Sequence, residues 1–176
     1  RAARMGFTAI ELPMTVPEVF PALRQELAET GLSVTLCAAL GPGRDLSSFD
    51  PAVRSATMDY LTACLEAGRA LGAGVLCGPL YAGGGKRHWL DPADKKREWE
   101  LAVTGLRELA RRAADCGMAL SLEPLNRYRT SVCNTAAQVL ELIGDIGAPN
   151  VGLHFDTYHA CLEEKDLTGA LEAALR

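Results

Sequence analysis

Two short runs in the second half of the chain alternate between large apolar residues and small or polar ones. Residues 118–123 follow this pattern and end in Glu123, and residues 151–156 follow it and end in Asp156. Because side chains alternate across a strand, each run predicts a buried parallel strand with one apolar and one polar face. Such strands are typical of an α/β barrel, whose helices lie outside and whose interior narrows.

Strand-like and helix-like segments alternate along the rest of the chain as well. An aspartate followed by proline marks two helix starts, at Asp50 and Asp91, and a capping box opens a third helix at Thr135. Apolar residues at i, i+3, i+4 and i+7 support these helices. The predicted strands cover residues 8–14, 32–40, 74–80, 118–123 and 151–156, and the predicted helices cover residues 17–30, 50–71, 91–115, 135–146 and 166–176.

Five strands separated by helices predict an α/β fold with a parallel sheet and right-handed crossovers. A doubly wound nucleotide-binding sheet would carry a G-x-G-x-x-G or G-K-[ST] loop, but here Gly83-Gly-Gly-Lys86 leads to Arg87. Polar residues instead gather at the carboxyl ends of several strands, where barrel enzymes place their chemistry. The sequence therefore predicts an incomplete (β/α)8 TIM barrel.

The length of the chain bears on how much of a barrel is present. A closed barrel of eight strands typically takes about 250 residues, whereas this chain has 176. Five strands cannot close a barrel, and the first and last would expose unpaired edges. We expect residues 1–176 to be a single TIM-barrel domain truncated at both ends, with one strand missing before it and two after it. The alternative is a genuinely small open sheet.

Charge and cysteine content limit the binding partners and the cellular compartment that we expect for the protein. The net charge of −4 gives no electrostatic footprint for nucleic acid or for an anionic membrane. No apolar stretch approaches the roughly 20 residues of a membrane span. The six cysteines include no C-x-x-C pair and no zinc-knuckle spacing, so we expect buried, reduced thiols and a cytoplasmic protein.

Glu123 and Asp156 end two successive predicted strands, so a barrel would bring both acids to the same rim. Ligand sets made mainly of carboxylates favour manganese or magnesium over a structural zinc ion. A hard divalent cation bound there acts as a Lewis acid toward a bound oxygen. Glu123 is also placed to act as a general acid or base.

The segments Glu123-Pro-Leu-Asn-Arg127 and Asp156-Thr-Tyr-His159 resemble the xylose isomerase-like barrel superfamily. Within it the chain is most similar to the D-tagatose/D-psicose (L-ribulose) 3-epimerases. The resemblance implies Mn²⁺, with Co²⁺ or Mg²⁺ as substitutes, held by two glutamates, an aspartate and a histidine. It implies that Glu123 is both a ligand and one of two acid/base groups, that Asp156 is a ligand, and that His159 contacts a substrate oxygen. The ligand histidine and the second glutamate would belong to the missing strands.

Other polar residues lie near these motifs. Asn126 and Arg127 are expected to organise the loop after Glu123 and to pair with acids, and Asn126 is also a candidate substrate contact. Glu11 ends the first predicted strand, where it would line the site or form a structural ion pair. We interpret His154, one layer below Asp156, as a packed and hydrogen-bonded interior histidine rather than a ligand.

Arg129 departs from the pattern of these epimerases. The resemblance implies a second glutamate at this position, six residues after Glu123, that hydrogen-bonds the sugar near its carbonyl end. A guanidinium has five donors and no acceptor, so it cannot make those contacts and suits a carboxylate or phosphate instead. We therefore expect Arg129 to bind substrate, and the substrate to carry an acid or phosphate group rather than to be an ordinary free ketohexose.

Three functions fit the sequence. The first is a metal-dependent sugar isomerase or epimerase that acts on a ketose or ketose derivative through a cis-enediolate, and it is the one we predict. The second is an endonuclease IV-like phosphodiesterase, which also carries Asp-Thr-x-His, but three histidines and a charge of −4 argue against its zinc cluster and DNA face. The third is a non-catalytic sugar-binding barrel. The resemblance also implies a homodimer, although no stretch of the sequence marks a contact surface.

Overall fold

The five strands of the chain form one parallel sheet in the order β1-β2-β3-β4-β5 in a computed structural model that describes residues 1–14 and 20–175. A doubly wound sheet reverses its strand order at a switch point, whereas here each strand pairs with the next strand along the chain. This sequential order is that of a barrel wall, and it confirms the predicted parallel α/β arrangement. The strands are β1 (Ala9–Pro13), β2 (Ser33–Cys37), β3 (Val75–Gly78), β4 (Ala119–Leu122) and β5 (Val151–Leu153).

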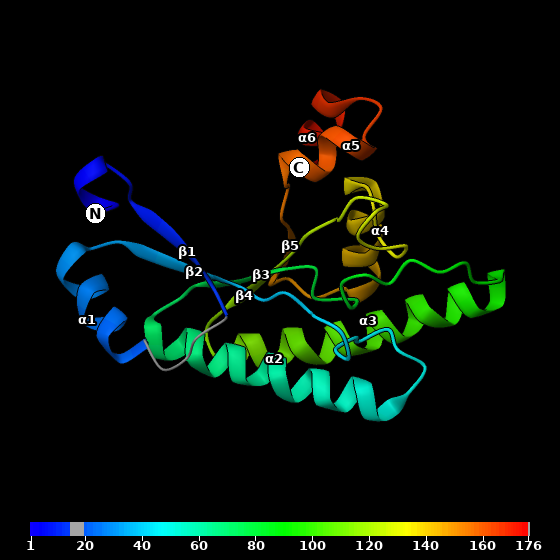
Figure 1. Cartoon of the computed structure of the whole chain (residues 1–176), viewed down its shortest axis with the longest axis horizontal. Coiled ribbons are helices and arrows are strands. Elements are labelled where there is room, and N and C mark those ends of the chain that lie inside the picture. The colour runs from blue at the N-terminus through cyan, green and yellow to red at the C-terminus, as the bar shows by residue number, and fades with distance from the viewer. Residues whose placement is uncertain (15–19, 176) are drawn as a thin grey trace.

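Helices follow the strands and cover one face of the sheet. Figure 1 shows α2 and α3 side by side beneath the strands, while α5 and α6 follow β5 at the top of the view. None of the helices in the described residues is long and apolar enough to cross a membrane. The helices are η1 (Ala3–Met5), α1 (Phe20–Thr30), α2 (Pro51–Leu71), α3 (Pro92–Asp115), α4 (Ala136–Ile146), α5 (Thr157–Glu163) and α6 (Leu167–Ala174).

Local capping explains where the long helices begin. The side chain of Asp50 accepts a hydrogen bond from the backbone N–H of Ala52, and Asp91 caps α3 in the same way. Thr135 and Gln138 form the predicted capping box at α4. These three predicted starts are confirmed, whereas the predicted start of the first helix lies outside the described residues.

The sheet has the two unlike faces that the alternation predicted. In β4, Leu120 and Leu122 are buried against the helices, while Ala119 and Ser121 are partly exposed on the opposite face. Leucines from β2, β3, α2 and α3 complete this core, because the apolar stripe of each helix turns toward the apolar face of the strands. The opposite, more polar face is therefore free to carry a site.

The strand ladders end earlier than the sequence predicted. β5 ends at Leu153, although the backbone N–H of His154 still donates to the carbonyl of Leu122 at 2.8 Å. Asp156 then caps α5, a short helix that the sequence interpretation missed. A helix of two turns carries too little periodicity to be distinguished from a loop.

Gly78 ends β3 in a conformation that only glycine adopts readily. Its φ is +125°, and a Cβ atom there would lie 2.6 Å from the carbonyl oxygen of Ala38. The carbonyl of Gly78 in turn accepts the backbone N–H of Glu123 at 3.1 Å. This close approach of β2, β3 and β4 fixes the backbone from which Glu123 projects.

Candidate metal and acid–base site

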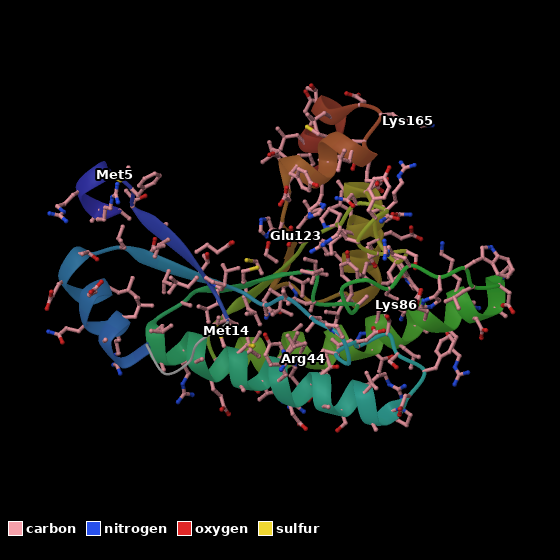
Figure 2. The ribbon with its side chains drawn as sticks, in the orientation of Figure 1. Met5, Met14, Arg44, Lys86, Glu123 and Lys165 are labelled. Atoms are coloured by element: carbon pink, nitrogen blue, oxygen red, sulfur yellow. The ribbon has the colours of Figure 1, made fainter. Side chains whose placement is uncertain are left out.

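Glu123 lies directly beyond the carboxyl end of β4 and is 8 % exposed. Its backbone carbonyl accepts a hydrogen bond from the hydroxyl of the buried Tyr81 at 2.9 Å. Figure 2 shows Glu123 between the sheet and the segment that leads to α5. The backbone of Glu123 is thus held on both sides, and its carboxylate is directed toward the end of the neighbouring strand β5.

Glu123, Asp156 and His159 come together at this end of the sheet. Each offers one ligand atom, and the three atoms lie within 4.8 Å of one another. The Nε2 atom of His159 is 3.8 Å from the nearer carboxylate oxygen of Glu123. Neighbouring parallel strands explain the convergence, because β4 and β5 deliver their next residues to the same edge.

The two acids titrate in opposite directions. Burial and then the negative charge of Asp156 raise the pKa of Glu123 to about 7. Burial also acts to raise the pKa of Asp156, but hydrogen bonds from the backbone N–H groups of His159 and Tyr158 outweigh it and hold that pKa below its ordinary value. A pair of acids separated in this way can keep one group ionised while the other exchanges a proton near neutral pH.

His159 is held as a hydrogen-bond donor toward the site. Its Nδ1 atom accepts a hydrogen bond from the backbone N–H of Asn126 at 3.0 Å. In a neutral imidazole whose Nδ1 accepts, the proton is on Nε2, which is the atom that faces Glu123. Burial lowers the pKa of His159, which favours this neutral form. This tautomer suits contact with a substrate oxygen better than a bond to a metal ion.

The loop after Glu123 is organised by Asn126 and Arg127, as predicted. The side chain of Asn126 lies 2.9 Å from Nδ1 of His159 and accepts the backbone N–H of Tyr128 at 3.1 Å. Arg127 forms a two-pronged ion pair with Glu163 at the end of α5, with a shortest distance of 2.9 Å. These contacts tie the loop to the helix that carries His159.

A cavity of about 500 Å³ lies in front of these groups. Glu123 and His159 line it together with Arg129 and Cys37. Arg129 is exposed at the wall, and among the described residues its guanidinium makes no hydrogen bond or ion pair. The cavity therefore combines an acid, a donor histidine and a free cation.

Glu11 and His154 lie outside this cavity. Both line a neighbouring cavity of about 290 Å³ on the inner face of the sheet. Glu11 accepts a hydrogen bond from the thiol of Cys77 at 3.1 Å and forms no ion pair with a described residue. The prediction of a hydrogen-bonded His154 is wrong for Nδ1, which is buried without a hydrogen-bond partner in the described part of the chain.

A sequence profile described as Xylose isomerase-like TIM barrel matches residues 1–176. The chain belongs to this family. A curated ketose 3-epimerase from Arthrobacter globiformis is 35 % identical over 164 residues, which are 92 % of this chain and 56 % of the relative. An L-ribulose 3-epimerase from Methylomonas sp. (strain DH-1) is 33 % identical over 175 residues, or 98 % of this chain and 60 % of the relative.

The chain is also similar to solved structures of sugar epimerases. A D-allulose 3-epimerase from Methylomonas sp. in complex with D-allulose superposes with a TM-score of 0.90 and 32 % identity, over 98 % of this chain and 60 % of that one. The predicted TIM-barrel class is confirmed. The chain spans 56–60 % of the length of these relatives, and the prediction of one domain truncated at both ends stays a prediction.

Two side-chain clusters of this barrel wall escaped the sequence interpretation. Cys37 and Cys77 are register partners on β2 and β3, a pairing that linear spacing cannot reveal. Lys86 was noted only as the end of a glycine loop, yet its amine contacts Asp45 at 2.8 Å and Glu98 at 2.7 Å. Of the cysteines, which are all free, Cys64, Cys77 and Cys133 are buried as predicted, Cys37 and Cys116 are partly exposed, and Cys161 is exposed.

The Glu123 cluster fits a hard divalent cation. Two carboxylates lie close together there, and burial first and the charge of Asp156 second raise the pKa of Glu123, so an ionised pair is unfavourable. A cation held between the two carboxylates would relieve the repulsion and favour both ionised forms. Oxygen donors are the ligands that Mn²⁺ and Mg²⁺ prefer.

Proposed function

We propose that this chain forms part of a metal-dependent sugar epimerase that moves a proton at the carbon next to the carbonyl of a ketose or ketose derivative. The observation that carries the proposal is the convergence of Glu123 and Asp156 at the carboxyl end of neighbouring strands, where the pKa of Glu123 is raised to about 7. The relatives named ketose 3-epimerase and L-ribulose 3-epimerase support the same reaction.

Glu123 and Asp156 would hold the cation, with Mn²⁺ as our assignment and Co²⁺ or Mg²⁺ as alternatives. When bound, the ion supplies Lewis-acid stabilisation of the negative charge that develops on the sugar's carbonyl and hydroxyl oxygens. The remaining ligands, a histidine and a second glutamate, belong in our proposal to the part of the relatives' length that this chain does not span.

The described residues supply two further functions in the reaction. Glu123 removes or returns the proton on one face, because its carboxylate lies at the end of β4 and lines the cavity. His159 donates its Nε2 proton to a sugar oxygen, and Asn126 holds the ring in the required tautomer. Inversion also needs a base on the opposite face, which we assign to the second glutamate.

Arg129 points to the class of substrate. It lines the cavity with Glu123 and His159, and in the described residues no acid neutralises it. A guanidinium in that position recognises a carboxylate or a phosphate through paired hydrogen bonds. We therefore propose that the sugar carries an acidic group. We also propose, from the sequence, that the protein works in the cytoplasm on a small molecule and forms a homodimer.

Exchange of solvent deuterium into candidate ketoses, measured by NMR with Mn²⁺ present and with the full-length protein, tests the reaction. We expect label at carbon 3, whereas label at carbon 1 would indicate a ketose–aldose isomerase. Glu123→Gln should abolish the exchange, and the matched surface variant Glu100→Gln should not, because Glu100 is 62 % exposed on α3. A lack of exchange in every sugar tested would favour a non-catalytic barrel, and salt-sensitive binding of abasic DNA would favour an endonuclease.

The substrate class has its own test. The ratio of kcat/KM for acidic or phosphorylated sugars to that for free ketoses should be high for the natural protein. In Arg129→Glu the ratio should fall by about 10-fold or more, because a charge-assisted hydrogen bond of about 1.5–3 kcal/mol becomes a repulsion. An equal ratio in both proteins would remove the acidic group from the proposal and leave the epimerase intact.

A further inference from the structure

Three donor atoms from three successive strands meet on the inner face of the sheet. They belong to Glu11 of β1, Cys37 of β2 and Cys77 of β3, and one carboxylate oxygen and two sulfur atoms lie within 4.8 Å of one another. Cys37 and Cys77 are register partners, so both thiols leave the same face of the sheet at the same level. The thiol of Cys77 donates a hydrogen bond to Glu11 at 3.1 Å.

This cluster adjoins the site of the proposed reaction but shares none of its acids. Glu11 and Cys77 line the neighbouring cavity of about 290 Å³, whereas Cys37 lines the cavity in front of Glu123. Neither the proton transfer nor the binding of Mn²⁺ proposed above uses a sulfur ligand. Three chemistry-bearing side chains are thus assembled in the barrel wall without an assigned function.

The sulfur and oxygen atoms of these side chains determine which metal ions the site would bind. Thiolate sulfur is a soft ligand that binds Zn²⁺, whereas Mn²⁺ and Mg²⁺ prefer oxygen. Two sulfur ligands of one tetrahedral ion lie about 3.8 Å apart when each metal–sulfur bond is about 2.3 Å. The spacing within 4.8 Å therefore needs only small side-chain rotations to close around an ion.

The cluster is also accessible and held by regular backbone. Each donor projects from a hydrogen-bonded strand, which limits the rearrangement that binding requires. Cys77 is buried and Cys37 partly so, while Glu11 is exposed. The cavity of about 290 Å³ that Glu11 and Cys77 line leaves a fourth position for water.

We propose that Glu11, Cys37 and Cys77 form a binding site for one thiophilic divalent cation, with Zn²⁺ as the natural occupant. Binding replaces the two thiol protons by two metal–sulfur bonds and releases both protons to solvent, so no oxidant or reductant takes part. The hydrogen bond from Cys77 to Glu11 is exchanged for coordination of both groups to the same ion. The site differs in ligand chemistry from the oxygen-rich pair of Glu123 and Asp156.

Cobalt spectroscopy tests the site independently of catalysis. Co²⁺ is titrated into reduced, metal-free, full-length protein, and thiolate-to-cobalt charge-transfer absorbance is recorded in the near ultraviolet. The expected result is one such band whose final intensity corresponds to one sulfur-ligated ion per chain and which is bleached by Zn²⁺. The cluster of Glu123, Asp156 and His159 contains no sulfur, so it cannot produce this band. Glu123→Gln should therefore keep the band even if it abolishes activity.

Three variants assign the ligands. Cys77→Ser, which keeps the size of the side chain, should remove the band and weaken Zn²⁺ binding by at least about 100-fold, because removing a direct ligand costs at least as much as removing its supporting partner. Glu11→Gln should weaken binding by about 10-fold or more while the sulfur band remains. Cys161→Ser is the matched control, because this exposed thiol on α5 is the one most open to adventitious metal.

Thermal unfolding separates loss of the site from loss of the fold. Zn²⁺ should raise the Tm of the natural protein and of Cys161→Ser, but not that of Cys77→Ser, with all three unfolding cooperatively in EDTA. A band that survives Cys77→Ser or disappears in Cys161→Ser would overturn the proposal. The proposal would also be overturned if the natural protein gave no sulfur band. It would equally be overturned if the natural protein formed a disulfide between Cys37 and Cys77 in air and retained no Zn²⁺.

Discussion

Two regions of the barrel wall each hold one buried and one partly exposed acid, and they differ in what lies between the acids. Beside α3, Asp45 and Glu98 share the amine of Lys86, at 2.8 and 2.7 Å. At the ends of β4 and β5, Glu123 and Asp156 share no lysine or arginine among the described residues, and the nearest basic group is the neutral His159. Both pairs lie next to loops that follow strands.

The difference separates scaffold from site. A buried charge is unfavourable unless an opposite charge or a hydrogen-bond network compensates it. The Lys86 cluster has its own compensation and joins two loops, since the Lys86 carbonyl also accepts the backbone N–H of Ser131 at 2.8 Å. The Glu123 cluster has no lysine or arginine between its acids in the described part of the chain, which is the property expected of a place where an external cation binds.

The largest effect is expected from removing the charge of Glu123. Glu123→Gln should reduce kcat/KM for the epimerisation by about 10²–10⁴-fold, the usual contribution of a positioned acid/base group. Its Tm without divalent cations should be unchanged or higher, because the amide removes one of two crowded negative charges. Retention of full activity by a folded Glu123→Gln protein would show that another group moves the proton.

Lys86→Met, in contrast to Glu123→Gln, should lower the stability of the fold. The substitution leaves Asp45 and Glu98 without their shared cation, and breaking such a pair costs about 3 kcal/mol of unfolding free energy. Urea denaturation measures the loss. Lys96→Met is the matched control, because its ion pair with Glu100 is 3.9 Å long and exposed, and its loss should change stability by less than about 0.5 kcal/mol. Equal effects of the two variants would contradict a scaffold function for the Lys86 cluster.

A smaller effect is expected in the pH dependence of the free energy of unfolding, to which Glu123 contributes. The pKa of Glu123 is raised from 4.5 to about 7 on folding, so between these values the folded state binds more protons than the unfolded state. Stability without divalent cations should therefore fall by about 2–3 kcal/mol as pH rises from about 4.5 to about 7, and level off above that. The lowered pKa of Asp156 acts only in more acidic solution, where stability is lost as pH falls.

Glu123→Gln provides the control for that slope. The variant should lose the decline between about pH 4.5 and about pH 7 and keep the acid-side loss that belongs to Asp156. Denaturant titrations at several pH values in EDTA supply the measurement. An unchanged slope in the variant would mean that a different group carries the proton uptake.

Local chemistry explains why so much of the fold could be predicted from the sequence. The caps at Asp50, Asp91 and Thr135 satisfy backbone groups within four residues, so their information lies entirely in short segments. The acids at the strand ends were found for a related reason. Alternation along a strand assigns faces, and parallel neighbours bring their carboxyl ends to one edge.

What could not be predicted depends on contacts between segments that are far apart in the sequence. Cys37 and Cys77 meet because of the register between β2 and β3, and Lys86 meets Asp45 across 41 positions of sequence. The His159 tautomer depends on the backbone N–H of Asn126, which only the folded loop places there. In each case the partner is set by geometry and not by spacing.

The smallest effect is expected at Arg127, the partner of Glu163. Arg127 is 62 % exposed, so its ion pair contributes little to stability, and Arg127→Lys should shift the Tm by no more than about 2 °C. The planar fork also positions α5, and lysine cannot reproduce its paired hydrogen bonds to one carboxylate. We therefore expect kcat/KM to fall by about 2–5-fold with an almost unchanged Tm, because His159 shares that helix. Glu163→Gln should reproduce the loss and the double variant should add nothing to it, whereas additive losses would mean that the two residues act on the site separately.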